Sequence, residues 1–295
     1  MSVPGRIRGS GPTTPILAFA EDRGARHVGM NATVDSGHPQ PAAAHKIDFR
    51  GNVSDGNLLA HFCVELPVLI TKTSLSQTVD AINAAFFDGR TLATAERGQA
   101  ARWITGRQGL PGAYGDTFAG FPSERSRGIV LFTGEHIASA SARHILGEEA
   151  SRALRLLRVR DPNVTRALDG ADRGLMRCLE RAAEDPRKSN PGLFCCGKCS
   201  VGLWRNLLAG GLDRREERLR RGASHLKSMR DGEHRWRKFP FWYTVLALSE
   251  MDSVEARTEL KHAAPVLERT ASRAVPSAVY ARRRHELAVR TLNRL

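Results

Sequence analysis

Three cysteines lie close together in the segment Cys195-Cys196-Gly-Lys-Cys199. Cys196 and Cys199 have the C-x-x-C spacing with which two thiolates bind one tetrahedral Zn²⁺, and Lys198 would stabilise a thiolate. A structural zinc site needs two further ligands, for which the chain offers Cys195, Cys178, His225 and His234. The sequence therefore names Cys196 and Cys199 as candidate metal ligands, with zinc as the candidate cofactor.

Two other interpretations of these cysteines stay open. Small thiols also pack as modest hydrophobic side chains at the start of a helix. A redox-active C-x-x-C ordinarily follows a strand in a β-α-β unit, and the sequence shows no such unit, so this interpretation is less favoured.

The segment Arg235 to Tyr243, RWRKFPFWY, places five aromatic residues among three cations. Such a stretch could stack nucleic-acid bases, bind a prenyl or other apolar ligand, or bind an anionic group. However, Phe241, Val245 and Leu248 share one helical stripe, which is typical of a core helix. We favour the core interpretation for the aromatic residues, with the cations in solvent.

The histidines give weaker indications. His144 lies in the apolar stripe of its predicted helix, which favours a core or boundary histidine over a catalytic base. His225 and His234 flank Asp231, and a His–Asp pair can transfer protons, but no nucleophile follows at a diagnostic spacing. The glycine-rich GRQGLPGAYG matches neither of the phosphate-binding loop patterns.

Composition sets outer bounds on the protein class. With 295 residues, 41% of them hydrophobic and 26% charged, the chain is typical of a globular protein. It has no run of the roughly 18 apolar residues that cross a bilayer, and Ile16–Ala20 is too short for a signal peptide, which predicts a cytoplasmic protein. The net charge of +14 would suit nucleic acid or an acidic protein, which is the alternative class of partner. However, much of the excess is arginine dispersed beside acidic residues, which is typical of solvated helix faces and is the interpretation that we favour.

The elements that would position these residues are helical. Residues 1–50 lack apolar periodicity and are predicted to be disordered, and residues 51–295 to form a single all-α repeat domain. The folded part begins with Asn57–Ile70, and 192–251 is predicted to be a helix, a basic glycine-containing turn and a helix. The remaining predicted helices are Thr73 or Ser74 to Phe87, Thr94–Thr105, His136–Leu157, Val164–Ala183, Ser253–Arg269 with a kink or break at Pro265, and Pro276–Leu292.

Helices joined by glycine-aromatic turns recur along the chain, which indicates helical-hairpin repeats. The turn Gln108-Gly-Leu-Pro-Gly112-Ala-Tyr114 resembles the Q-x-x-x-G-x-W turn of squalene and terpene cyclases and of protein prenyltransferase β subunits. Cys199-Ser-Val-Gly-Leu-Trp204 is similar to the helix start that lines their cavity, and MRDGEHRW is a looser version of the turn. The resemblance covers Asn57–Leu295 and implies an α/α toroid with a central apolar cavity.

The resemblance also implies a function, the binding of an apolar small molecule or peptide in that cavity, with isoprenoid transfer or cyclisation as the reaction if there is one. Asp169-Gly-Ala-Asp172 lacks the paired aspartates of the cyclase D-x-D-D motif. Gly197 stands where protein prenyltransferases have the aspartate of their zinc-binding Asp-x-Cys. The residues expected to contact a ligand are Tyr114, Trp204, Trp236, Phe241, Trp242 and Tyr243.

Overall fold

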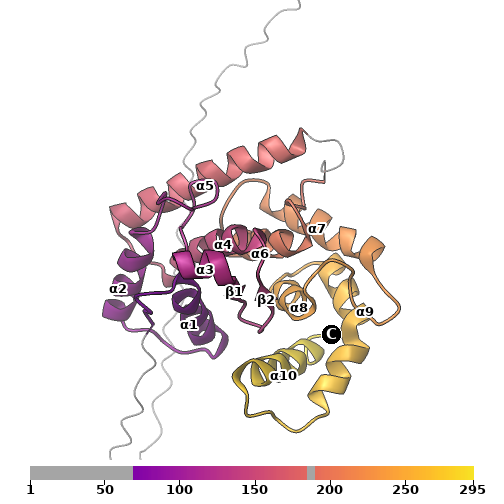
Figure 1. Cartoon of the computed structure of the whole chain (residues 1–295). Coiled ribbons are helices and arrows are strands. Elements are labelled where there is room, and N and C mark those ends of the chain that lie inside the picture. The colour runs from indigo at the N-terminus through magenta and orange to yellow at the C-terminus, as the bar shows by residue number, and fades with distance from the viewer. Residues whose placement is uncertain (1–68, 185–189) are drawn as a thin grey trace, which may run out of the picture. The chain divides into compact units, whose positions relative to one another are not determined.

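The computed structural model describes residues 69–184 and 190–295, which belong to one compact unit, Cys63–Leu295. The predicted disordered segment 1–50, and all of Asn57–Ile70 except its last two residues, lie outside the described residues. Ten helices hold 62% of the described residues, and strands together with isolated β-bridges hold 4% (Figure 1). The prediction of a mostly helical unit is confirmed.

Local capping explains where the first helices begin. Helix α1, Leu75–Phe87, starts after Ser74, whose hydroxyl accepts a hydrogen bond from the Gln77 N–H. Helix α2, Thr94–Thr105, has the predicted bounds. Phe86 lies on the same face as Val79 and Ile82, but it is in the last turn of α1 and is 39% exposed.

A short hairpin replaces the first part of a predicted helix. Helix α3, Pro122–Arg127, leads into the antiparallel strands β1, Ile129–Val130, and β2, His136–Ile137. Helix α4, Ser141–Leu157, begins only after them, so the prediction of a helix from His136 was wrong at its N-terminal end. Gly128 permits the close strand approach: it has φ +82°, and a Cβ there would lie 2.4 Å from the Ile137 carbonyl oxygen.

Six helices complete the unit. They are α5, Pro162–Ala183; α6, Gly197–Leu208; α7, Arg215–Met229; α8, Phe241–Ser249; α9, Val254–Ala271; and α10, Val279–Leu292. Helix α9 does not end at Pro265, so the predicted break is wrong. Helix α10 starts three residues after the predicted Pro276, and Tyr280 in its first turn is 39% exposed.

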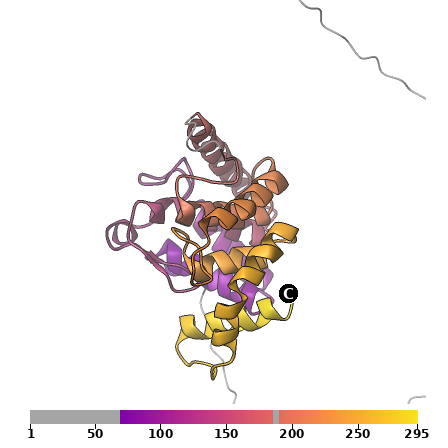
Figure 2. The same ribbon diagram turned by 90° about the vertical axis from the view of Figure 1, so that its right-hand side faces the viewer.

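The helices pack as successive pairs. One series runs α1, α4, α6, α8, in which each helix packs on the next, and in a second series α2 packs on α5 and α7 on α9. Within the pairs α4/α5, α6/α7 and α8/α9 the two helices also contact each other. Figure 1 shows α4 and α6 in the middle of the unit, and Figure 2 shows α7 to α10 nearest the viewer.

Two of the glycine-aromatic turns have the same closing contact. An isolated antiparallel bridge joins Gln108 to Phe118 after α2, and another joins Arg230 to Trp236 after α7. Both turns lead from a helix of the second series toward one of the first series. The similarity expected from the sequence therefore extends to backbone pairing.

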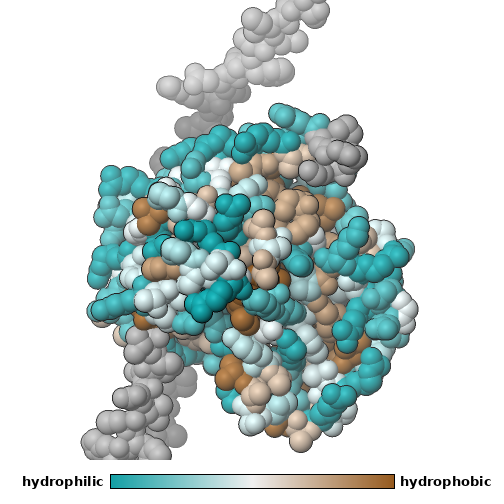
Figure 3. All heavy atoms as spheres, in the orientation of Figure 1, coloured by the Kyte–Doolittle hydropathy of each residue, from teal (hydrophilic) through white to brown (hydrophobic). Residues whose placement is uncertain are grey.

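Hydrophilic side chains cover much of the face shown in Figure 3. Among the described residues, no helix combines the length and the apolar composition that crossing a bilayer requires.

Candidate metal site

Two helix N-termini bring a histidine and three cysteines together. His144 lies in the first turn of α4, and Cys196 is the N-cap residue of α6, with Cys199 in its first turn. The His144 Nδ1 atom lies 3.1 Å from the Cys195 Sγ and 3.3 Å from the Cys199 Sγ. Because α4 packs along α6, residues that are 51 and 55 positions apart in the sequence meet at one end of the two helices.

The ligand atoms of His144, Cys195 and Cys199 all lie within 4.8 Å of one another, and this group could hold a metal ion. Tetrahedral Zn²⁺ with ordinary bond lengths separates a nitrogen from a sulfur ligand by about 3.6 Å and two sulfurs by about 3.8 Å. The two N···S distances therefore need to widen by only a few tenths of an ångström. Cys199 is buried, His144 is half-buried and Cys195 is exposed.

Cys196 is close to this group without belonging to it. Its Sγ atom lies 3.5 Å from the Cys199 Sγ and 3.4 Å from the Ser141 hydroxyl oxygen. Of the predicted pair of ligands, Cys199 belongs to the group and Cys196 lies outside it, and the other two members are His144 and Cys195.

Aromatic rings cover the imidazole. The Tyr114 ring centroid lies 3.6 Å from that of His144, and the Phe194 centroid lies 5.6 Å from it. Burial lowers the pKa of His144, which keeps the imidazole neutral and able to bind a cation. Tyr114 is the one predicted ligand-binding aromatic residue that contacts the group.

The pKa values of the three thiols are shifted in different directions. A hydrogen bond to Cys196 raises the pKa of Cys195 to about 11, and hydrogen bonds to its neighbouring thiols raise the pKa of Cys199. Hydrogen bonds from Cys195 and Cys199 lower the pKa of Cys196.

An open cavity of about 740 Å³ lies beside the cysteines. Its lining combines Cys195 and Cys196 with apolar side chains and with two lysines and a histidine, namely Leu193, Phe194, Met229, Phe239, Lys198, Lys238 and His225. The cavity gives a ligand access to the exposed side of the cluster.

The other predicted metal ligands lie elsewhere. The Cys178 Sγ atom is 3.4 Å from the Arg181 guanidinium and is buried. His225 lies against Phe239, with ring centroids 6.4 Å apart, and His234 lies beside His262. The structure places none of these three residues in the candidate group.

Most of the predicted ligand-binding aromatic residues are packed in the interior. The Trp204 indole donates to the Gly192 carbonyl oxygen at 2.7 Å, and the Trp236 indole donates to a Glu259 carboxylate oxygen at 2.8 Å. Phe241 stacks on Trp236, and the half-buried Trp242 lies edge-on to Phe241. Since these rings pack on protein, the RWRKFPFWY segment offers a hydrophobic core, as the sequence favoured, and little platform for bases.

The space bounded by α1, α4, α8 and β1 is nearly filled. Tyr243, Glu149 and Phe132 line a cavity of about 20 Å³ there, which is the space of about one water molecule. The hairpin contributes to this filling, because the Arg283 guanidinium of α10 donates to the Phe132 carbonyl oxygen and the Tyr243 N–H donates to the Glu135 carboxylate.

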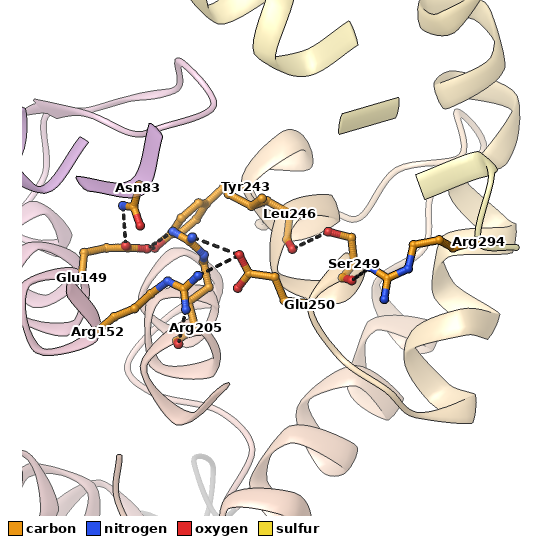
Figure 4. A network of polar contacts seen from close by, with 9 residues as sticks. All are labelled: Asn83, Glu149, Arg152, Arg205, Tyr243, Leu246, Ser249, Glu250 and Arg294. Atoms are coloured by element: carbon orange, nitrogen blue, oxygen red, sulfur yellow. Dashed lines mark hydrogen bonds and ion pairs between the residues drawn. The ribbon is translucent and has the colours of Figure 1, made fainter. Parts of the chain in front are cut away.

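A buried polar network links the helices of the first series, and sequence patterns gave no sign of it (Figure 4). The Glu149 carboxylate accepts hydrogen bonds from Asn83, Arg205 and the Tyr243 hydroxyl. Glu250 accepts from Arg205 at 3.2 Å and from Arg152 at 2.9 Å. The network ties α1, α4, α6 and the C-terminal end of α8 together, and Arg205 lies in the last turn of α6, away from the candidate metal site at the N-terminus of that helix.

Comparison of the chain with protein-family models, with curated proteins and with solved structures found no match. The interpretation of the site therefore rests on its geometry and chemistry.

Proposed function

We propose that this chain is a zinc protein in which His144, Cys195 and Cys199 bind one Zn²⁺ ion. The observation that carries the proposal is the convergence of an imidazole nitrogen and two thiol sulfurs, from two distant segments, within 4.8 Å. Thiolate and imidazole ligands suit Zn²⁺, whereas Ca²⁺ and Mg²⁺ take oxygen ligands. A group of this composition therefore favours Zn²⁺ over Ca²⁺ and Mg²⁺.

Three protein ligands leave the fourth tetrahedral position to a water molecule or a bound ligand, as in zinc sites that act on substrates. The cavity of about 740 Å³ reaches the exposed Cys195, so a ligand in it would approach the metal directly. Leu193, Phe194 and Phe239 favour an apolar or peptidic ligand there. We place the ligand in this cavity, at the ends of the helices, instead of in the filled space between them.

The packing of successive helix pairs supports the finer fold assignment, an α/α toroid with α1, α4, α6 and α8 as its inner helices. The recurring turns that lead toward inner helices support it too. In that setting isoprenoid transfer or cyclisation is the reaction class that the resemblance implies. The zinc proposal does not depend on this assignment.

Metal analysis of the purified full chain tests the proposal. We expect about one zinc per chain, and we expect His144→Ala and Cys199→Ser to lose it while both variants remain folded by circular dichroism. His225→Ala is the matched control, because its imidazole lies outside the group, and it should keep the metal. Wild-type protein that binds no zinc from zinc-supplemented buffer, under reducing conditions, would refute the proposal.

Cobalt substitution gives an independent readout. Co²⁺ in the same site should show thiolate-to-metal charge-transfer absorption that Cys195→Ser weakens. A small exogenous ligand such as cyanide should change the visible cobalt spectrum if the fourth position is open. An unchanged spectrum would show that a fourth protein ligand closes the site.

A further inference from the structure

The Cys196 thiol lies beside the candidate zinc ligands and is accessible from the cavity. Its side chain is exposed and lines that cavity, whereas Cys199 is 0% exposed. Their sulfur atoms are 3.5 Å apart, closer than the two sulfurs of a tetrahedral zinc site, for which about 3.8 Å is expected. An accessible thiol is thus paired with a buried thiol that is itself a candidate metal ligand.

We propose that Cys196 and Cys199 form a reversible disulfide when a hydroperoxide enters the cavity, and that this disulfide expels the metal ion from the group. The expulsion rests on the proposed zinc site, whereas the disulfide itself does not. Cys196 is the peroxide-reactive thiol and Cys199 is the thiol that resolves its oxidised form.

The backbone allows the bond to form. Cys196 is the N-cap residue of α6, with φ −157° and ψ 172°, and Cys199 lies in the first helical turn. At a helix N-terminus a C-x-x-C pair can close a disulfide, as redox-active C-x-x-C motifs do. The sulfurs must approach from 3.5 Å to the roughly 2.05 Å of a disulfide, a closure that rotation of the two side chains would supply.

The chemistry balances with the peroxide as the only oxidant. The Cys196 sulfur attacks one peroxide oxygen, so that an S–O bond forms, the O–O bond breaks, and the leaving alkoxide takes up the thiol proton as an alcohol or, from hydrogen peroxide, as water. The Cys199 sulfur then attacks the sulfenic sulfur, the S–S bond forms, and the hydroxyl leaves as water. Its proton comes from the Cys199 thiol when no metal is bound, and from solvent when Cys199 is a metal-bound thiolate. The two thiols lose two electrons in total and the peroxide gains them.

Loss of the metal follows from the ligand set. A sulfur in a disulfide no longer carries the thiolate charge that binds Zn²⁺. With Cys199 oxidised, only His144 and Cys195 of the group remain, and two ligands hold zinc far more weakly than three. A thiol reductant would restore Cys199 and allow zinc to bind again.

The experiment treats reduced, zinc-loaded full chain with hydrogen peroxide and follows two signals in parallel. Zinc release is measured with a chromophoric chelator, and disulfides are mapped by mass spectrometry after alkylation and digestion. We expect release of about one zinc per chain together with a Cys196–Cys199 disulfide, and reversal of both by a thiol reductant. Cys196→Ser should keep zinc but release it at least about tenfold more slowly, whereas the matched control Cys178→Ser should behave as wild type.

Each other outcome has a defined meaning. If Cys196→Ser binds no zinc, Cys196 is a ligand and the inference is wrong. If wild type and Cys196→Ser release zinc at the same rate, or if the mapped disulfide joins Cys195 instead, the inference is also wrong. If wild type binds no zinc yet still forms the Cys196–Cys199 disulfide, the proposed zinc function fails and metal expulsion with it, while the peroxide-reactive thiol pair stands.

Discussion

The ring of Tyr114 lies against the imidazole of His144, with centroids 3.6 Å apart and the planes inclined by 34°. The two residues come from different helix pairs, since Tyr114 belongs to the turn that follows α2 and His144 to the first turn of α4. This contact fixes the ring plane of the histidine and thereby the direction of its Nδ1 atom, which points to the thiols of Cys195 and Cys199.

Removal of that ring should weaken the zinc site. Residues that orient a metal-ligating histidine typically change metal affinity by about 10- to 100-fold when they are replaced. We expect Tyr114→Ala to lower zinc affinity by about tenfold or more, measured by competition with a chromophoric chelator. Tyr114→Phe keeps the ring and should stay near wild type, as should Tyr280→Ala on α10. Equal affinities for all four proteins would show that the ring does not orient the ligand.

Glu148 predicts a pH-dependent stability. Burial raises its pKa from 4.5 to about 8, against the opposing hydrogen bond from Asn206. Below pH 4.5 the carboxyl is protonated in both the folded and the unfolded chain, so its contribution is fully present. Between pH 4.5 and about 8 only the unfolded chain ionises, and the free energy of unfolding should fall by up to about 1.4 kcal/mol per pH unit.

Urea denaturation of Glu148→Gln at several pH values checks this. The variant keeps a polar side chain of the same shape but cannot ionise, so its stability relative to wild type should rise from pH 5 to pH 8 and then level off. Glu180→Gln on the exposed face of α5 serves as control and should show a flat difference. A flat difference for Glu148→Gln as well would contradict the burial-driven shift.

Arg205 is the cation that contacts both Glu149 and Glu250 of the buried network. Its side chain is 2% exposed and forms ion pairs with Glu149 of α4 and with Glu250, the residue that follows α8. Arg205→Met leaves both carboxylates without this cation, and the loss of one partner from a buried ion pair costs about 3–5 kcal/mol. Chemical denaturation should show this loss, whereas Arg214→Ala, which removes an exposed pair with Glu217, should cost far less.

Since Arg205→Met could fail to fold, Arg205→Lys gives a second measurement. It keeps the charge but loses the two-pronged donor geometry, so its cost should lie between those of the other two variants. The double variant Arg205→Met, Glu149→Gln should regain part of the stability lost by Arg205→Met alone. If Arg205→Lys and Arg214→Ala were equally mild, the network would not contribute to stability as described.

Local signals in the sequence were enough to predict most helices. Ser74 and Ser253 cap α1 and α9 as their hydroxyl side chains suggest, and α2 has the predicted bounds. The hairpin at 129–137 was missed because each of its strands has only two residues, too few for an alternating pattern to appear. Its position depends on contacts with α8 and α10, which no local window contains.

The site was only half predictable for the same reason. The C-x-x-C spacing pointed to Cys199, because its partners are nearby in the sequence. His144 lies 55 residues before Cys199 and was read as a core histidine from its own helix alone. Arg205 could not be predicted either, since dispersed arginines beside acidic residues are typical of solvated helix faces. Only the packing of α6 between α4 and α8 shows that this arginine is buried.

Close packing of α5 on the turn after α2 gives the last prediction. A Cβ on Gly174 would lie 1.8 Å from the Gly115 carbonyl oxygen, a backbone atom that cannot rotate away. Gly174→Ala should therefore destabilise the protein by more than the 1–3 kcal/mol typical of overpacking, although alanine is the better helix former.

The matched control is Gly98→Ala in α2. A Cβ there would lie 3.3 Å from the Arg102 guanidinium, the flexible end of a side chain that can move away. This variant should therefore gain up to about 1 kcal/mol from helix propensity. Thermal denaturation of both variants measures this difference in stability. Because Gly115 adjoins Tyr114, Gly174→Ala should also weaken zinc binding. A Gly174→Ala protein as stable as Gly98→Ala would mean that α5 and this turn are not in contact as the structure has them.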